Sequence, residues 1–297
     1  MKLVRFFTIG AGGGGDVLSA YVVGRMLEEE RNAEFVCGGV VWERFRVDKK
    51  PGPRSLSEIE DARKINDCLA WMKGARIGKL RPAVAEVAEI AGDAVGIDIT
   101  EPCKLSRAIG EFCVSNSLTP VGVDAGGDIL ARGGEKGVVS PLCDSIMLSA
   151  LAELKAPLAV VGFGSDCELS REELERYLSE IAELDGLIGA SIVPKSLAEE
   201  VLERAGKVKT HASRIPLVAA KGYFGKYESW DKTVDVSVLN ALVFFVRSEV
   251  VYDLNPMAKA VRGCRSIEEA NEALHALGIK TELDLELEMA REMAGLA

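Results

Sequence analysis

The sequence predicts an α/β protein with a doubly wound, mostly parallel sheet covered by helices on both faces, in a Rossmann-like arrangement. Short apolar runs rich in β-branched residues alternate along the chain with longer stretches that carry apolar residues at helical spacing. The short runs are almost continuously apolar, which is typical of strands that are buried on both faces. A glycine-rich turn follows the first run, at the position where such sheets bind ligands.

Strands and helices are expected to alternate over the first two-thirds of the chain. Two prolines two positions apart make Lys49–Arg54 a loop, because proline disrupts both helix interiors and central strands. Ser57–Lys73 is either a helix or a structured excursion. Ser170 is the expected N-cap of the helix that follows it. The expected strands are Leu3–Ile9, Glu34–Trp42, Ala94–Ile99, Pro120–Asp124, Leu158–Phe163 and Leu187–Val193, and the expected helices are Asp16–Glu30, Lys104–Ser115, Pro141–Leu154, Arg171–Leu184 and Leu197–Ala205.

The chain becomes less regular from about residue 207 onward. Val236–Arg247 and Ile267–Leu277 have the spacing of helices, and Glu249–Leu254 has the composition of a strand. Glu282–Met293 is expected to be an acidic helix that packs on the rim of the sheet. No change of composition marks a linker, so residues 1–297 are predicted to form a single α/β domain.

Composition excludes several classes of function. Among 297 residues the net charge is −10 and aromatic residues make up 6%, whereas nucleic-acid binding needs a basic surface and stacking rings. No apolar run approaches the roughly 20 residues of a membrane span, and no signal peptide is recognisable. We therefore expect a cytoplasmic protein whose partners are neither nucleic acid nor membrane; assembly into a homo-oligomer remains open. Because glutamine is absent while Glu, Lys and Arg abound, the source is expected to be a thermophile.

The seven cysteines are scattered, and none has metal-binding or redox-motif spacing. They are expected to be buried, reduced thiols, although a disulfide remains open in a thermophile.

The first candidate site is the glycine-rich corner between the first strand and the first helix. Glycines without Cβ atoms let the backbone approach a ligand, and the start of the following helix favours an anion such as phosphate. A tight turn with no ligand is the alternative interpretation. The corner contains Gly10, Gly12, Gly13, Gly14 and Gly15.

Asp16 directly follows this corner, and its carboxylate would repel an anion at the same helix start. A divalent cation between the carboxylate and a phosphate would remove the conflict. Asp16 could also bind ligand hydroxyls, accept a proton in catalysis, or simply cap the helix.

A second candidate site follows the expected strand Pro120–Asp124. Its acids are the hard oxygen ligands that Mg²⁺ or Mn²⁺ prefers, so a metal site at Asp124, Asp128 and Asp144 is a hypothesis. Asp124 and Asp128 are also candidate catalytic residues. The residues expected to bind the ligand in this region are Gly126, Gly127 and Ser140, the last of which caps the next helix.

Asp98, Asp124 and Asp166 each lie at or near the carboxyl end of a predicted strand. Because ligands of parallel sheets bind outside the carboxyl ends of the strands, these acids and the glycine corner are expected to converge on one pocket.

The end of the second strand supplies further candidates. Glu43 occupies the approximate place of a ribose-binding acid in dinucleotide-binding folds. Arg44 and Arg54 carry planar guanidinium groups suited to phosphate or carboxylate. Of the two histidines, His211 is the candidate catalytic base, and His275 is expected to be a surface or packing residue.

Four motifs together resemble one protein family. They are Gly12–Asp16, the pair Trp42–Arg44 and Pro51–Arg54, the segment Val123–Asp128, and the segment Ser140–Asp144. In this order they resemble the "domain of unknown function 1152" family. The resemblance implies a compact α/β protein found mainly in archaea, and it implies no particular reaction, cofactor or catalytic residue.

Three functions are compatible with these residues. The leading hypothesis is an enzyme, a transferase or hydrolase, that acts on a phosphorylated or nucleotide-like small molecule. Mg²⁺ is its candidate cofactor. The second is an oxidoreductase that uses NAD(P), with Glu43 on the ribose. The third is a sensor that binds a small phosphate- or carboxylate-bearing ligand without catalysis.

Overall fold

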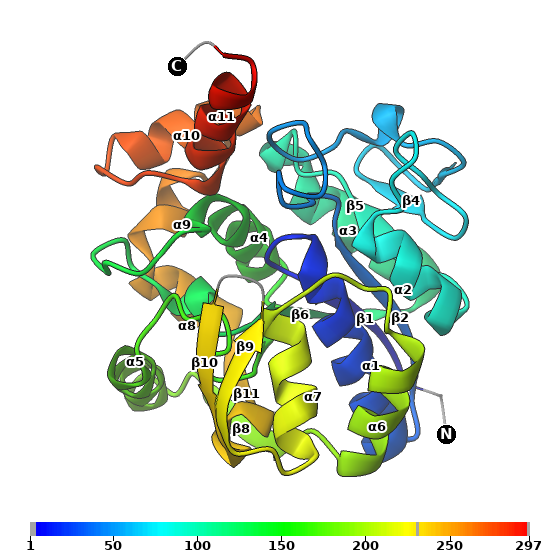
Figure 1. Ribbon diagram of the computed structural model, residues 1–297, viewed down its shortest axis with the longest axis vertical. Helices are drawn as coiled ribbons and strands as arrows, with labels where there is room; N and C mark the ends of the chain where they lie inside the picture. The colour runs from blue at the N-terminus through cyan, green and yellow to red at the C-terminus, as the bar shows by residue number, and fades with distance from the viewer. Residues whose placement is uncertain (1–3, 230–231, 296–297) are drawn as a thin grey trace.

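A nine-stranded sheet runs through the middle of the molecule (Figure 1), in a computed structural model that describes residues 4–229 and 232–295. Its strand order is β3-β4-β5-β2-β1-β6-β7-β11-β8, and the neighbours from β5 to β7 pair in parallel. Antiparallel pairing reverses β4 and β11 alone among these described strands. The sheet strands are β1 (Arg5–Gly10), β2 (Glu34–Val40), β3 (Arg63–Lys64), β4 (Leu69–Trp71), β5 (Val95–Ile97), β6 (Thr119–Ala125), β7 (Pro157–Val161), β8 (Leu187–Ile192) and β11 (Leu242–Arg247).

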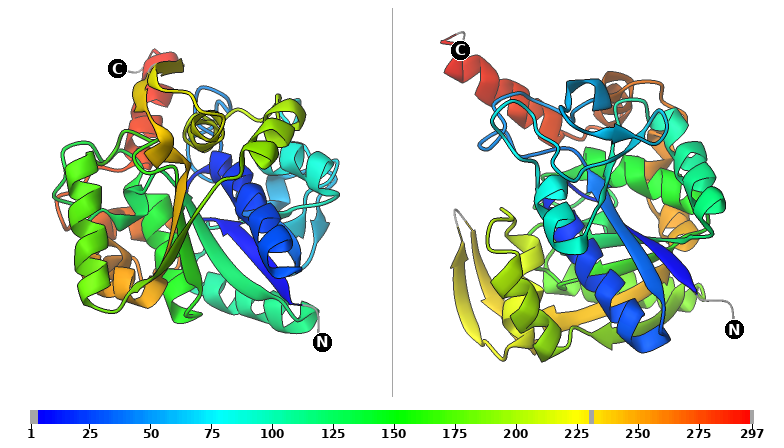
Figure 2. Two further views of the ribbon diagram at one scale, coloured as in Figure 1. Left: turned by 90° about the horizontal axis from the view of Figure 1, so that it is seen from below. Right: turned by 90° about the vertical axis from the view of Figure 1, so that its right-hand side faces the viewer.

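Helices cover both faces of the sheet, as Figure 2 shows from two further directions. One buried cluster joins α1, α2 and α6 to the sheet, and another joins α3, α4, α5 and the helices α8 to α10 to its opposite face. The predicted α/β fold with a mostly parallel sheet is therefore confirmed. The helices are α1 (Val17–Arg31), α2 (Ala83–Ala91), α3 (Leu105–Asn116), α4 (Pro141–Glu153), α5 (Arg171–Glu183), α6 (Lys195–Arg204), α7 (Ile215–Ala220), α8 (Ser248–Leu254), α9 (Pro256–Ala260), α10 (Ile267–His275) and α11 (Glu282–Met293).

Most predicted elements in the first two-thirds are present, with ends displaced by one or two residues. Leu3, the predicted start of the first strand, lies outside the described residues. Ser170 caps α5 as expected, because its hydroxyl accepts the N–H of Glu173. Residues 57–73 form the structured excursion rather than a helix and contribute the short strands β3 and β4. The helix α2 was not predicted from the sequence.

Two predictions in the last third are wrong. Val236–Arg247, predicted as a helix, contains a 3₁₀ turn followed by β11, which lies between β7 and β8. Glu249–Leu254, predicted as a strand, belongs to helix α8. In both cases packing overrides local preference. Leu242–Arg247 completes the sheet, whereas Ser248 at the start of α8 bonds the Leu151 carbonyl of α4 at 3.3 Å.

The last third also contributes a small hairpin, β9 (Gly225–Ser229) with β10 (Lys232–Val236), and the acidic helix α11. Figure 1 shows α11, in red, at the end of the molecule toward which β1 and β2 run. No described helix combines the length and apolarity needed to cross a membrane.

Candidate functional site

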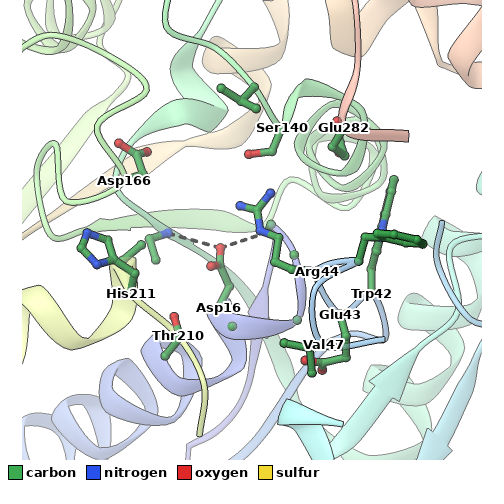
Figure 3. Close-up of a pocket in the computed structure, with 18 of the residues that line it drawn as sticks. Asp16, Trp42, Glu43, Arg44, Val47, Ser140, Asp166, Thr210, His211 and Glu282 are labelled. Atoms are coloured by element: carbon green, nitrogen blue, oxygen red, sulfur yellow. Dashed lines mark hydrogen bonds between the residues drawn. The ribbon is translucent and has the colours of Figure 1, made fainter. Parts of the chain in front are cut away.

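A cavity of about 300 Å³ lies at the carboxyl ends of the central strands (Figure 3). The glycine corner after β1, the residues that follow β2, the β6–α4 connection and the turn after β7 all line it. The glycine corner and Asp166 line this cavity as predicted, whereas Asp98 and Asp124, which were expected to converge with them, do not line it. Two segments of the last third, Lys209–Ala212 and the inner face of α11, complete the wall.

The glycine corner packs closely against the protein's own side chains. A Cβ atom on Gly12 would lie 2.6 Å from a carboxylate oxygen of Asp16, and one on Gly14 would lie 2.7 Å from Glu43. At Gly15 the clash would be with the Thr210 hydroxyl at 2.6 Å. Gly13 differs, because its nearest neighbour would be 3.7 Å away. Most of these glycines therefore allow close packing, and Gly13 is the most open position of the four.

Backbone N–H groups of the corner are partly occupied. Gly12 donates to Asp16 at 3.0 Å, and Gly14 donates to the Trp42 carbonyl at 2.8 Å. Gly10 does not line the cavity; a Cβ there would lie 2.7 Å from the backbone of Asp16, so this glycine lets β1 pack against the start of α1. The corner therefore has fewer backbone N–H groups available to bind an anion than the sequence predicts.

Asp16 projects into the cavity and does not cap α1 through its side chain. One carboxylate oxygen accepts the N–H groups of Gly12 at 3.0 Å and Ala125 at 3.3 Å. Burial raises the pKa of Asp16 to about 7, although both N–H groups and Arg44 act to lower it. A carboxyl group with this pKa can exchange a proton near neutral pH.

Asp124, Asp128 and Asp144 form a compact group of carboxylates, each offering an oxygen within 4.8 Å of the others. They come from the end of β6, the 3₁₀ turn that follows it and the first turn of α4. Asp124 is fully buried at 0% exposure and Asp144 is 4% exposed. These three residues are the metal set predicted from the sequence, and the fold brings them together.

Two members of this trio, Asp124 and Asp144, have carboxylate oxygens without the partners that buried charges need, whereas Asp128 accepts the Ser140 hydroxyl at 3.2 Å. Neither oxygen of Asp124, nor Oδ2 of Asp144, makes a well-formed hydrogen bond to a described residue. Burial, followed by repulsion from the neighbouring acids, raises the pKa of all three groups well above the usual range, and the nearby Asp128 side chain and Gly127 N–H only partly offset this at Asp124. An unpaired buried carboxylate is costly unless it binds a proton or a cation.

Other carboxylates around the cavity are already satisfied by backbone N–H groups. Glu282, on α11, accepts from Leu142 at 3.0 Å and Cys143 at 2.8 Å, so it occupies the N-terminus of α4 that the sequence offered to a ligand. Glu168 accepts from the N–H and hydroxyl of Ser140 at 3.0 and 2.7 Å. The chain's own acids therefore bond Ser140, which was predicted to bind the ligand, and the backbone N–H groups that follow it.

Glu286, one turn after Glu282, connects α11 to the segment after β2. It accepts from the Trp42 indole N–H and the Gly52 N–H, both at 2.9 Å, and from the Phe45 N–H at 3.2 Å. Burial raises the pKa of both glutamates, and that of Glu282 reaches about 7.

Arg44 is one of two arginines, with Arg46, that line this largely acidic cavity. Burial alone would lower its pKa, but the surrounding carboxylates, led by Glu168 and Glu282, raise it, so the group stays charged. The side chain has exposed surface and lines the cavity, and none of the ion pairs found among the described residues involves it. Figure 3 shows it pointing into the space between Asp16 and Ser140.

Several predicted residues lie elsewhere or have another partner. Arg54 does not line the cavity, because it forms a buried ion pair with Asp48. Glu43 lines the cavity, but its carboxylate accepts the Ala83 N–H at the start of α2 at 2.6 Å, and burial raises its pKa to about 7. Asp98 lies outside the cavity and accepts the Leu56 N–H at 2.8 Å.

Gly126 and Gly127 do not line the cavity either. Their φ angles of +127° and +114° turn the chain after β6, and a Cβ on Gly126 would lie 2.0 Å from the Asp166 carboxylate. This turn lets the Asp128 N–H donate to Asp166 at 3.2 Å. The two glycines therefore position the acids rather than contact a ligand.

The cavity also contains residues that the sequence interpretation did not select. Lys209 and Thr210 adjoin His211, which lines the cavity as predicted for the candidate base. The missed residues with the clearest contacts are Glu168, Glu282, Glu286, Lys209 and Thr210. A spacing of four residues between the two glutamates of α11 was the available signal, because it places them on one helix face.

The fold and the site define an α/β protein with a carboxylate-lined cavity at the carboxyl edge of its sheet. A family model described as "Protein of unknown function (DUF1152)" matches residues 7–290, and the chain belongs to this family. The resemblance stated from the four motifs is thus confirmed. Neither the curated proteins nor the solved structures contain a match to the chain.

Proposed function

We propose that the protein is a divalent-cation-dependent enzyme that acts on a small phosphorylated molecule, by phosphoryl transfer or hydrolysis. The observation that carries this proposal is the trio Asp124, Asp128 and Asp144, whose oxygens lie within 4.8 Å of one another and of which Asp128 and Asp144 line the cavity. Carboxylate oxygens are the ligands that Mg²⁺ and Mn²⁺ prefer. A divalent cation would relieve the repulsion among the three acids, and their unpartnered oxygens would become its ligands.

An anionic substrate needs positive charge in a cavity whose wall is largely acidic and carries Arg44, Arg46 and Lys209 as its basic residues. Arg44 supplies one charge, and its planar guanidinium can bind two oxygens of a phosphate at once. A bound cation would supply two more. Gly13 lines the cavity and is the most open position of the glycine corner, so its N–H is the backbone group that we propose donates to the same phosphate.

Asp16 is the residue proposed to move a proton. Its pKa of about 7 suits a group that must both accept and release a proton at neutral pH. The Gly12 and Ala125 N–H groups hold one of its oxygens, which fixes the carboxylate in the cavity. A divalent cation contributes charge stabilisation and lowers the pKa of a bound water.

The oxidoreductase alternative is less well supported. Glu43 would have to bind a ribose, yet its carboxylate already accepts the Ala83 N–H. The pyrophosphate of a dinucleotide would also have to approach the Asp16 carboxylate across Gly12. A sensor would share the cavity and the cation, and would bind phosphorylated molecules without converting them.

Thermal denaturation with and without Mn²⁺ tests the proposal. Mn²⁺ is expected to raise the melting temperature of the EDTA-treated wild-type protein, because it binds only the folded state. Asp128→Asn should abolish most of this rise. The matched control is Asp98→Asn, since Asp98 is also a buried acid after a strand but lies outside the cavity. Equal shifts for the two variants, or no shift in the wild type, would contradict the cation site.

Turnover separates an enzyme from a sensor. With Mn²⁺ present, a panel of phosphate esters should include at least one that releases phosphate or transfers it, and Asp16→Asn should remove this activity while leaving Mn²⁺ binding in place. Binding of phosphate esters without turnover across the panel would instead support the sensor.

A further inference from the structure

The outer part of the cavity differs in character from its acidic floor. Helix α11 presents four positions to the cavity, spaced as one helix face. They are Glu282, Leu285, Glu286 and Met289. The two glutamates turn their carboxylates to backbone N–H groups of neighbouring segments. What α11 offers to a ligand is therefore the pair of apolar side chains.

Apolar residues of two other segments line the same region. Val47, after β2, and Val139, before α4, both belong to the cavity wall. Val139 is 38% exposed and Met289 is 39% exposed, whereas Asp124 and Asp144 of the acidic trio are 0% and 4% exposed. Three separate segments thus contribute aliphatic side chains to the cavity wall, and a purely polar ligand would leave this surface in contact with water.

The aromatic side chains of the cavity wall do not offer stacking faces. Trp42 is 4% exposed and donates its indole N–H to Glu286, and Phe45 is similarly buried. The accessible apolar surface is therefore aliphatic. It suits a flexible hydrocarbon group better than a planar base, which binds best against an aromatic ring.

We propose that the substrate is an amphipathic phosphate ester, with its phosphate at Arg44 and the acidic trio and an aliphatic chain on Leu285, Met289, Val47 and Val139. This inference rests on the proposed function for the position of the phosphate, and it adds the class of the group that the phosphate carries. The carboxylates of the floor exclude a hydrocarbon chain, so the polarity of the cavity fixes the orientation.

Calorimetric titration in Mn²⁺ tests the inference with inorganic phosphate, methyl, butyl and octyl phosphate, all below micelle-forming concentrations. Affinity should increase with chain length by up to about fourfold for each methylene that is buried. Equal affinity for all four probes would overturn the inference while leaving the proposed function intact. Failure of Mn²⁺ itself to bind would overturn the proposed function and the inference together.

Two variants locate the chain. Met289→Ser and Leu285→Ser should flatten the dependence on chain length while changing the affinity for inorganic phosphate less than twofold. Met293→Ser is the matched control, because Met293 is on the same helix, 65% exposed and outside the cavity. A dependence on chain length that both cavity variants retain in full would contradict this placement, as would adenosine monophosphate binding more tightly than octyl phosphate. If a variant fails to fold, the wild-type series still decides the inference.

Discussion

The two turns that form the floor of the cavity differ in how their polar groups are satisfied. In the glycine corner after β1, the N–H groups of Gly12 and Gly14 bond to Asp16 and Trp42. In the turn after β6, Asp124 keeps two buried oxygens without a well-formed hydrogen bond to a described residue. The glycine-rich turn thus has hydrogen-bond partners within the protein for these N–H groups, whereas the acid-rich turn leaves carboxylate oxygens without such partners. Unsatisfied groups, more than glycine content, indicate where a ligand belongs.

The largest expected effect follows from removing a charge from the acidic trio. Asp144→Asn should weaken Mn²⁺ binding by at least about 100-fold, since loss of a direct ligand should exceed the 10–100-fold cost of losing an outer partner. In EDTA the same variant should unfold at a higher temperature than wild type, because one repelling carboxylate is gone. Calorimetric titration and thermal denaturation measure the two effects. If the variant binds Mn²⁺ with wild-type affinity, the acid-rich turn does not bind the cation, and the proposed difference between the two turns is contradicted.

A dependence of stability on pH should be the next largest effect. Burial raises the folded-state pKa of Asp16, Glu43 and Glu282 to about 7, above their unfolded values. The folded protein therefore binds more protons than the unfolded chain between about pH 4 and 7, so stability falls as pH rises through this range. In EDTA the melting temperature should drop on the order of 5 °C from pH 5 to pH 8.

Mn²⁺ should reduce this drop, because it replaces protons among the acids. Melting curves at matched ionic strength, with and without Mn²⁺, provide the measurement. A melting temperature that rises from pH 5 to pH 8 in EDTA would show that these carboxyl groups are not raised in the folded state.

Single methyl groups should distinguish positions within the glycine corner. Gly12→Ala places a Cβ 2.6 Å from Asp16 and 3.0 Å from Asp144, and should cost about 1–3 kcal/mol of unfolding free energy. Gly13→Ala meets nothing closer than 3.7 Å and should cost less than about 1 kcal/mol. Urea denaturation compares them. Equal losses would mean that the corner is uniformly packed and offers no open position to a phosphate.

The smallest expected effect concerns the attachment of α11. Glu286→Gln keeps the shape of the side chain but weakens its hydrogen bonds to Trp42, Phe45 and Gly52, and should cost about 1 kcal/mol. Amide hydrogen exchange should increase in α11 and in the segment after β2, and remain unchanged in α6. Faster exchange throughout the molecule would show that the residue supports the whole fold rather than this contact.

Local chemistry explains which parts of the site could be predicted from the sequence. Asp124, Asp128 and Asp144 lie within one strand–turn–helix unit, so their proximity follows from the order of elements. Glu282 bonds residues 139 and 140 positions earlier in the chain, and that pairing depends on where the last helix packs. Arg54 was predicted to bind a phosphate or carboxylate of the ligand, but its guanidinium forms an ion pair with Asp48 inside the protein. The sequence pattern alone does not distinguish these two partners.

The fold was predictable to a similar extent. Strands and helices that alternate regularly carry a clear periodicity, and the central parallel strands were all expected. Leu242–Arg247 is apolar except for its last residue, and Ser248–Leu254 mixes apolar with polar residues. The state of both segments depends on a neighbour: the first fills the gap between β7 and β8, and the second packs on α4. Such segments are assigned by tertiary contacts rather than by their own composition.

Crystals soaked in Mn²⁺ and measured near the manganese absorption edge would locate the bound cation itself. An anomalous difference peak is expected among the carboxylate oxygens of Asp124, Asp128 and Asp144, and it should be lost in Asp128→Asn crystals. A fully soaked wild-type crystal that shows no peak there, or a peak that persists undiminished in the variant, would contradict the proposed cation site.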